Sequence, residues 1–371
     1  MPKQAVLLLA HGTPETVEQI PEYLRNVVSG RPLPQAVVEE IQHRYSLIGR
    51  SPLTEFTFAQ ARLVEEELNG AGEANSAPHP SDKNKDVARM GHPAIPVYVG
   101  MRNWRPYIPE VVRQMRADGV EEAAVICMAP QNSRTSVGLY RRAVDAEAGG
   151  LRIDFTAGWA EHPLLAEAFA ERLRPAWAKM SAQIGEPVQV LFTAHSVPKR
   201  TVEVVDGVGP GSAPRPGDKN NNVVPGPVAT PRPVGHPVWP GPAAEGDPYA
   251  EDARRTAELV AERVPEIPRW WFAFQSQGAS GGPWLGPSVE ETLDRMASEG
   301  VKALILQPIG FLCDHVEILF DVDILFREYA AQRGISLERP ESLNASKTLA
   351  RAVADLASQG LQRLRHSGVA K

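Results

Sequence analysis

Residues 310–323 hold the densest set of chemically active side chains in the chain, with Asp314, Glu317 and Asp321 separated by three and four residues. In an α-helix this spacing places all three carboxylates on one face. Most other side chains of the segment are aliphatic or aromatic, which is unusual for a helix surrounded by water. A solvated acidic face is one interpretation. Because carboxylates on a buried helix repel one another unless a cation or protons lie nearby, the segment also indicates a path for a cation or for protons.

One histidine, His315, lies inside the same segment. It stands two residues before Glu317, so in a helix the two side chains point apart, and the spacing matches no dedicated zinc motif. Two carboxylates and one histidine favour a divalent ion that is held loosely, in contrast to a permanent closed metal site.

Two further histidines, His11 and His195, each follow an apolar run that is typical of a buried strand. Near neutral pH an imidazole can accept a proton or bind a metal ion, although a structural role is the alternative for each histidine alone. The surrounding sequences are alike, since residues 6–14 read VLLLAHGTP and residues 190–198 read VLFTAHSVP. Two strand ends related in this way would face one shared cleft.

A second pair of matching segments supports an internal duplication. Residues 115–120 read MRADGV and residues 296–301 read MASEGV, and each leads into an apolar, strand-like run. The offset between them is 181 residues, close to the offset of 184 residues between the two histidines. Two matches at nearly one offset indicate a repeated architecture.

Short apolar runs alternate with amphipathic stretches in each half. The pattern predicts helices at residues 110–117 and 288–298, and strands at residues 6–10, 97–99, 123–129, 188–193, 271–274 and 303–306. In the second helix, Ser288 and Glu291 have the spacing of a capping box. The alternation predicts an α/β fold of two similar Rossmann-like halves, each a doubly wound parallel sheet. Functional loops are expected at the carboxyl ends of the strands.

Composition excludes several classes of function. The 371 residues carry a formal net charge of −6, unlike the basic surface of a nucleic-acid-binding protein. The two cysteines, Cys127 and Cys313, are too few for a disulfide framework, a cysteine-rich zinc module or a four-cysteine iron–sulfur cluster. The apolar run at residues 5–10 is too short for a signal peptide, and no run is long enough to cross a bilayer. We therefore expect a cytoplasmic protein.

Two polar segments interrupt the α/β pattern. Residues 71–94 mix polar and charged side chains, and residues 204–246 are rich in proline and glycine. Such compositions bury too little apolar surface to offset the entropy lost on ordering. We expect both segments to be surface insertions, the second one largely disordered.

A few other side chains could contact a flat or anionic ligand. Trp284 lies in a proline-bounded turn that could present its ring to a planar molecule, although a packed loop is the alternative. Arg44, Tyr45 and Ser51 combine positive charge with hydroxyls, as the edge of an anion site would require. No Walker A loop and no GxGxxG motif occurs, so nucleotide binding has no support from a motif.

Several motifs together resemble the ferrochelatase family, and most closely its bacterial coproporphyrin III type. They are residues 193–198 (TAHSVP), 246–249 (GDPY), 275–277 (QSQ) with 283–287 (PWLGP), and 310–317 (GFLCDHVE). The resemblance runs from Val6 to about Ala352 and implies two Rossmann-like halves with a porphyrin cleft between them. We place the halves at residues 1–180 and 181–371, and expect the C-terminal helix to return to the first half.

The resemblance implies an enzyme of haem biosynthesis that inserts Fe²⁺ into a porphyrin and releases two pyrrole protons. The motif histidine and glutamate fall on His195 and Glu317, which are then expected to be catalytic and to bind the metal. Asp314 and Asp321 would relay protons or metal. Such a reaction needs a base, a site for a partly dehydrated ion and a cleft that shapes the ring.

Contacts to the porphyrin also follow from the resemblance. Trp284 and Phe311 are expected to hold the plane of the ring. The remaining substrate-binding residues on this reading contact the propionates or the ring, and they are His11, Arg44, Tyr45, Ser51 and Tyr140.

Some positions depart from the family pattern. His11 stands where Gram-positive relatives often have tyrosine, and we expect it to ligate the iron of bound product from the face opposite His195. Val28 stands where those relatives have an arginine that contacts a propionate, so Arg31 or Arg25 is expected to substitute. Leu325 replaces an outer acidic residue, which makes a second peripheral cation site doubtful. The cysteine-bearing extension of animal forms is absent, so no iron–sulfur cluster is expected.

The expected partners are a porphyrin and Fe²⁺ as substrates, with no permanently bound cofactor and no nucleic acid. Coproporphyrin III is the favoured porphyrin and protoporphyrin IX the alternative. A cobalt or nickel chelatase and a non-enzymatic haem carrier are the other functions considered. We expect a monomer that makes transient contacts with neighbouring enzymes of the haem pathway.

Overall fold

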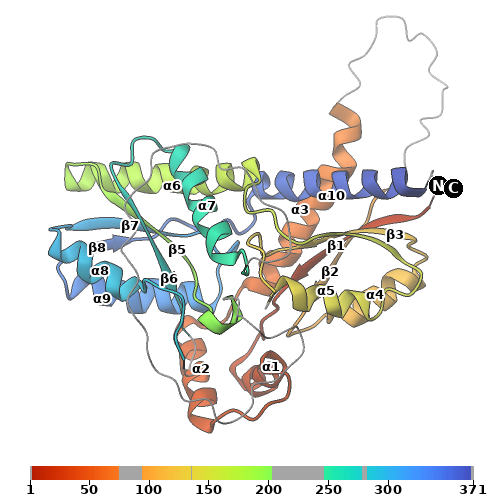
Figure 1. The fold of residues 1–371 in the computed structure, drawn as a ribbon, viewed down its shortest axis with the longest axis horizontal. Helices are drawn as coiled ribbons and strands as arrows, with labels where there is room; N and C mark the ends of the chain where they lie inside the picture. The colour runs from red at the N-terminus through yellow and green to blue at the C-terminus, as the bar shows by residue number, and fades with distance from the viewer. Residues whose placement is uncertain (1, 75–93, 135, 203–245, 278–281, 369–371) are drawn as a thin grey trace, which may run out of the picture.

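The computed structural model describes residues 2–74, 94–134, 136–202, 246–277 and 282–368. It contains two four-stranded sheets whose strands are all parallel. Figure 1 shows the sheets side by side, with α6 (Pro163–Ile184) and α10 (Lys347–Gly368) along one side of the molecule and α1 (Ile20–Val27) and α2 (Gln35–Ile48) on the other. None of the described helices is long and apolar enough to cross a bilayer.

The first sheet has the strand order β2-β1-β3-β4. Its strands are β1 (Gln4–Ala10), β2 (Val97–Met101), β3 (Glu122–Cys127) and β4 (Arg152–Thr156). Leu8 in the central strand lies opposite Val99 on one side and Ile126 on the other. Because β1 and β3 are buried on both faces, they read as nearly continuous apolar runs in the sequence.

The second sheet repeats this order as β6-β5-β7-β8. Its strands are β5 (Gln189–His195), β6 (Trp270–Gln275), β7 (Ala303–Pro308) and β8 (Ser336–Glu338). The predicted duplication is thereby confirmed, since β1 corresponds to β5 and β3 to β7, the pairs that the sequence repeats had matched. Each predicted strand is present. Strands β4 and β8 were not predicted, because neither has a continuous buried apolar run.

Helices cover both faces of the two sheets. The described helices not yet named are η1 (Val17–Gln19), α3 (Leu53–Ala74), α4 (Ile108–Ala117), α5 (Val137–Asp145), η2 (Lys199–Thr201), α7 (Tyr249–Glu262), α8 (Val289–Ser298), the π-helix η3 (Glu317–Phe326) and α9 (Arg327–Ala331). The predicted helices correspond to α4 and α8, and Ser288 caps α8 through the expected capping box with Glu291.

Helix α10 closes the core of the first half from the far end of the chain. It packs against β3, β4 and α3, and Arg363 pairs with Asp154 of β4 at 2.7 Å. A Cβ at Gly360 would lie 2.8 Å from the Asp154 carboxylate, so the close approach depends on glycine. Helix α6 runs without a break across residue 180, and the domain boundary at that residue stays a prediction.

The two polar segments fall mostly outside the described residues. Residues 71–74 continue α3, whereas residues 75–93 and 203–245 lie outside the described part of the chain. At the second gap the flanking backbones meet, since the amide of Asp247 donates to the carbonyl of Val202 at 3.0 Å.

The acidic segment differs from the α-helix that the sequence predicted. Helical structure begins only at residue 316, and residues 317–326 form a π-helix, in which hydrogen bonds span five residues. Asp314 lies before the helix, so the prediction that Asp314, Glu317 and Asp321 share one helical face is wrong. The irregular backbone from Gly310 to His315 places these carboxylates in different surroundings.

Candidate active site

A cavity of about 330 Å³ lies where the two halves meet. Its walls include residues at or just after the carboxyl ends of β1, β2 and β3 on one side, and of β5 and β7 on the other. Parallel α/β sheets bind ligands at this edge, because loops from neighbouring strands converge there. The volume falls within the range of small-molecule sites.

His195 and Glu317 face each other in this cavity. Nδ1 of His195, the last residue of β5, lies 3.1 Å from Oε2 of Glu317, the first residue of the π-helix. Burial lowers the pKa of His195, but the Glu317 carboxylate outweighs this and leaves the pKa above its ordinary value. Burial likewise raises the pKa of Glu317, and the two neighbouring histidines more than reverse it. Both shifts favour the form of the pair that combines an imidazolium with a carboxylate.

His315 completes this group, which corrects the expectation that it points away from Glu317. Its Nε2 lies 3.7 Å from Oε2 of Glu317, and its ring lies 4.3 Å from that of Phe311. Nδ1 of His315 donates to the carbonyl of Cys313 at 3.1 Å. Because a carbonyl can only accept, the neutral ring keeps its lone pair on Nε2, the atom that faces Glu317. The helical spacing rule failed because residue 315 is not helical.

Gly310 allows the two sides of this wall to approach closely. A Cβ there would lie 3.0 Å from Cα of Ala194 and 3.3 Å from the amide nitrogen of His195. The loop after β7 can therefore pack directly against the strand that carries His195. Tyr249 fixes the same strand end, since its hydroxyl donates to the carbonyl of His195 at 2.8 Å.

Asp321 lies one turn further along the π-helix and is buried. Ser276 donates a short hydrogen bond to its carboxylate, and Arg44 of α2 pairs with it at 3.1 Å. Burial is the main cause that raises the pKa of Asp321, and the charge of Glu317 adds to it. Asp321 thus connects the π-helix of the second half to α2 of the first half.

Asp314 is tied to a different group of side chains. It pairs with Arg339 at 3.1 Å and accepts hydrogen bonds from Ser342 and Asn344. Arg339 also pairs with Asp323 at 2.7 Å. Asp314 does not line the cavity, and neither does Asp321. The relay role of both residues stays a prediction.

The opposite wall carries His11, which follows β1. Its Nε2 lies 2.8 Å from the hydroxyl of Tyr23, and the amide nitrogen of Asn103 lies 3.2 Å from each ring nitrogen. Burial lowers the pKa of His11 to about 4, so the ring is neutral near pH 7. Because Tyr23 occupies Nε2, the role of His11 as a ligand of product iron stays a prediction.

A model of the ferrochelatase family matches residues 3–361. The chain belongs to the ferrochelatase family. It is 52% identical over 366 residues to a ferrochelatase of Acidobacterium capsulatum, covering 98% of this chain and 97% of the relative. A ferrochelatase of Herpetosiphon aurantiacus is 34% identical, covering 92% and 94%. A coproporphyrin III ferrochelatase of a Geobacillus species is 28% identical, covering 95% and 96%.

This member of the ferrochelatase family brings only some of the predicted substrate-binding residues to its cavity. His11, Tyr140 and Phe311 line the cavity together with His195 and Glu317. The other four do not line the cavity. Arg44 is paired with Asp321, and both Tyr45 and Ser51 are buried. Trp284 is half-buried in the loop before α8. The two proposed substitutes for an arginine at position 28 are exposed and also lie outside the lining, namely Arg25 and Arg31.

Several cavity residues of this ferrochelatase were missed by sequence reasoning. They include Tyr23, Arg102, Gln131, Tyr249 and His315. Tyr249 belongs to the GDPY motif, to which no role was assigned. The same motif joins the halves, because Asp247 accepts hydrogen bonds from the hydroxyl of Ser133 and the amide of Arg134.

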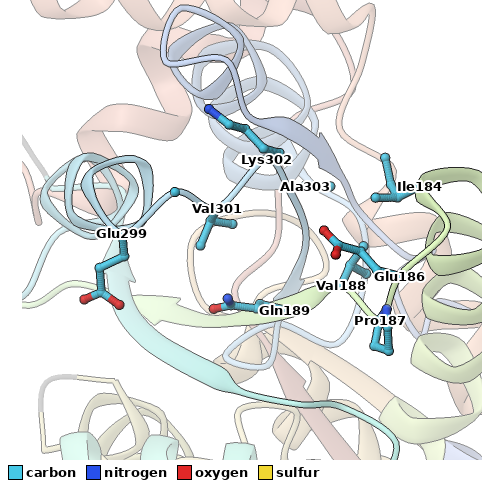
Figure 2. Close-up of a pocket in the computed structure, with 10 residues that line it drawn as sticks. Ile184, Glu186, Pro187, Val188, Gln189, Glu299, Val301, Lys302 and Ala303 are labelled. Carbon is cyan, nitrogen blue, oxygen red and sulfur yellow. The ribbon is translucent and has the colours of Figure 1, made fainter.

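Within the described residues, no group of three or more His, Cys, Asp or Glu side chains is arranged to hold a metal ion. A second pocket, of about 120 Å³, lies at the amino ends of β5 and β7 and is lined by Glu186, Gln189 and Lys302 among others (Figure 2). It lies at the opposite ends of these strands from the cavity that holds His195, so it is separate from the candidate active site.

Replacing Glu317 with Gln is expected to lower the pKa of His195 below its ordinary value of 6.5, since burial remains while the carboxylate charge is lost. NMR titration of the His195 ring checks this, and an unchanged pKa would contradict the assigned ion pair.

The same variant has a stability consequence that depends on pH. The stability that the raised pKa of His195 contributes is fully present below pH 6.5, and it is lost as the pH rises through the folded pKa of His195. The stability that the lowered pKa of Glu317 contributes is fully present above the ordinary Glu pKa of 4.5, and it is lost as the pH falls through the folded pKa of Glu317. The loss of unfolding free energy caused by Glu317→Gln should therefore be largest between pH 4.5 and pH 6.5.

Proposed function

We propose that this chain inserts Fe²⁺ into coproporphyrin III and releases the two inner pyrrole protons. The observation that carries the proposal is the His195–Glu317 pair inside a cavity shared by both halves. Family membership supports iron insertion as the reaction. Among the relatives, the name of the Geobacillus enzyme specifies coproporphyrin III, and that of the Acidobacterium enzyme says ferrochelatase alone.

The ion pair suits a reaction in which a dication replaces two protons. An arriving Fe²⁺ is attracted by the Glu317 carboxylate and repels the imidazolium of His195. The positive charge of the ion lowers the pKa of His195, which then releases its proton to solvent and becomes a base for a pyrrole N–H. Nε2 of His315 offers a second nitrogen beside the same carboxylate. Each of these groups is positioned before substrate binds, which lowers the reorganisation that the reaction requires.

Protons taken from the ring need a route out of the cavity. Asp321 has a raised pKa and lies one turn beyond Glu317, between Ser276 and Arg44. A carboxyl group with a raised pKa accepts a proton more readily than an exposed aspartate does. We therefore retain Asp321 as the first proton acceptor beyond Glu317.

The ring itself would lie against the wall formed by Phe311 and the His315 ring that packs on it. Aromatic faces of this kind bind planar π-systems favourably. His11 and Tyr140 would contact the other side of the macrocycle.

An anaerobic metallation assay with Fe²⁺ tests the proposal. We expect kcat/KM for coproporphyrin III to exceed that for protoporphyrin IX at least tenfold. A preference for protoporphyrin IX would overturn the substrate but leave the reaction intact. Metallation confined to Co²⁺ or Ni²⁺ in a sirohydrochlorin-type ring, or haem binding without any metallation, would overturn the reaction.

A further inference from the structure

Arg102 places a guanidinium in the wall of the active-site cavity. It follows directly after Met101, the last residue of β2, and lines the cavity together with His11 and Tyr140. Among the described residues of the lining it is the only arginine or lysine. It belongs to none of the motifs that the sequence showed.

The backbone holds this loop firmly beside His11. The amide of Arg102 donates to the carbonyl of Ala10 at 3.0 Å, and the amide of Asn103 donates to the carbonyl of His11 at 2.9 Å. The position of the Arg102 backbone is therefore set by the ends of two neighbouring strands, β1 and β2.

No described residue neutralises this charge. The guanidinium of Arg102 makes no hydrogen bond or ion pair within the described part of the chain. By contrast, Arg44 is paired with Asp321. Burial is the main cause that lowers the pKa of Arg102, and the side chains whose charges act on it are Tyr140, Tyr23 and Arg142, with no carboxylate among them.

A half-buried cation without a counter-ion is costly, because it loses hydration and gains no partner. The cost is removed when an anion binds in the cavity. Tyr140 adds a hydroxyl to the same wall, and this hydroxyl likewise has no hydrogen-bond partner among the described residues. A guanidinium beside a phenol offers several N–H and O–H donors, the set that a carboxylate accepts well.

We propose that Arg102 binds a carboxylate of the substrate, a propionate of the porphyrin, and so makes the enzyme selective for rings that carry a carboxylate on this side. The inference rests on the proposed function and deepens it. The residues that sequence reasoning assigned to the propionates do not supply a free cation here, since Arg44 is paired and Arg25 and Arg31 are exposed outside the cavity.

The number of propionates explains why this residue would discriminate between porphyrins. Coproporphyrin III carries one propionate on each pyrrole, so every orientation of the ring can present a carboxylate to Arg102. Protoporphyrin IX carries only two, and its other two pyrroles carry vinyl groups. A vinyl group facing Arg102 would leave the guanidinium desolvated and unpaired.

Fluorescence titration of the metal-free porphyrins tests the proposal without requiring turnover. Arg102→Gln is expected to raise the Kd for coproporphyrin III by about tenfold to a hundredfold, as for the loss of a charged hydrogen bond. The Kd for protoporphyrin IX should rise by a smaller factor, because only ring orientations that turn one of its two propionates toward Arg102 use this contact. Arg102→Lys keeps the charge and should recover part of the affinity.

Arg142→Gln is the matched control, since this exposed neighbour carries the same charge outside the cavity. Its Kd should equal that of the wild type, and circular dichroism verifies that each variant is folded. An unchanged Kd for coproporphyrin III in folded Arg102→Gln overturns the inference, as does an equal loss in Arg142→Gln. If Arg102→Gln weakens porphyrin binding but the wild type inserts no iron, the proposed reaction fails while this inference stands.

Discussion

His195→Ala is expected to lower the rate of iron insertion about a thousandfold, the middle of the range for loss of a positioned base. His195 ends β5 and faces Glu317 at 3.1 Å inside the cavity. The other described histidines of the cavity differ from His195, since Nε2 of His315 lies farther from Oε2 of Glu317, at 3.7 Å, and His11 lies within hydrogen-bond distance of Tyr23. Anaerobic turnover with coproporphyrin III measures the effect.

The fold should survive this substitution, because the side chain of His195 is about one third exposed and supports no other core residue through a hydrogen bond. His366→Ala is a suitable control, since this histidine is exposed near the end of α10. It should retain wild-type turnover. Near-normal turnover in folded His195→Ala would reject the assignment of His195 as the base.

Arg339→Met is expected to reduce the free energy of unfolding by about 3 kcal/mol, the effect typical of removing one partner from a buried ion pair. The Arg339 side chain is only 10% exposed and pairs with both Asp314 and Asp323. Without it, the carboxylates of Asp314 and Asp323 lose the cation that they share. Chemical denaturation at pH 7 measures the loss.

A matched control is available on the same surface. Arg327 is about half exposed and lies 3.9 Å from Asp323, so Arg327→Met should cost less than about 1 kcal/mol. Adding Asp314→Asn and Asp323→Asn to Arg339→Met should recover part of the stability, because the repelling charges are then removed. Equal losses in the two single variants would contradict the role given to Arg339.

Much of the fold could be predicted because its central strands are long and continuously apolar. Buried parallel strands such as β1 and β5 have no polar face. An alanine followed by a histidine stands at the end of each strand, and this repeated pair indicates the duplication. Edge strands such as β8 span three residues and alternate in burial, so they give no comparable signal.

That His195 and Glu317 lie in one cavity was also predictable, since both belong to motifs that resemble the ferrochelatase family. Their neighbours were not, because the backbone around them is irregular. The π-helix changes which residues share a face, and the non-helical residue His315 turns toward Glu317. Likewise, nothing in the sequence distinguishes Arg102, which lines the cavity, from Arg44, which forms an ion pair with Asp321. Such distinctions depend on contacts between residues far apart in the chain.

A crystal structure of this chain with bound coproporphyrin III tests the central claim most directly. The account predicts that the macrocycle occupies the cavity between the two halves, with His195 and Glu317 directed at its central nitrogens. A ring bound elsewhere, or one whose nitrogens face away from both side chains, would contradict it.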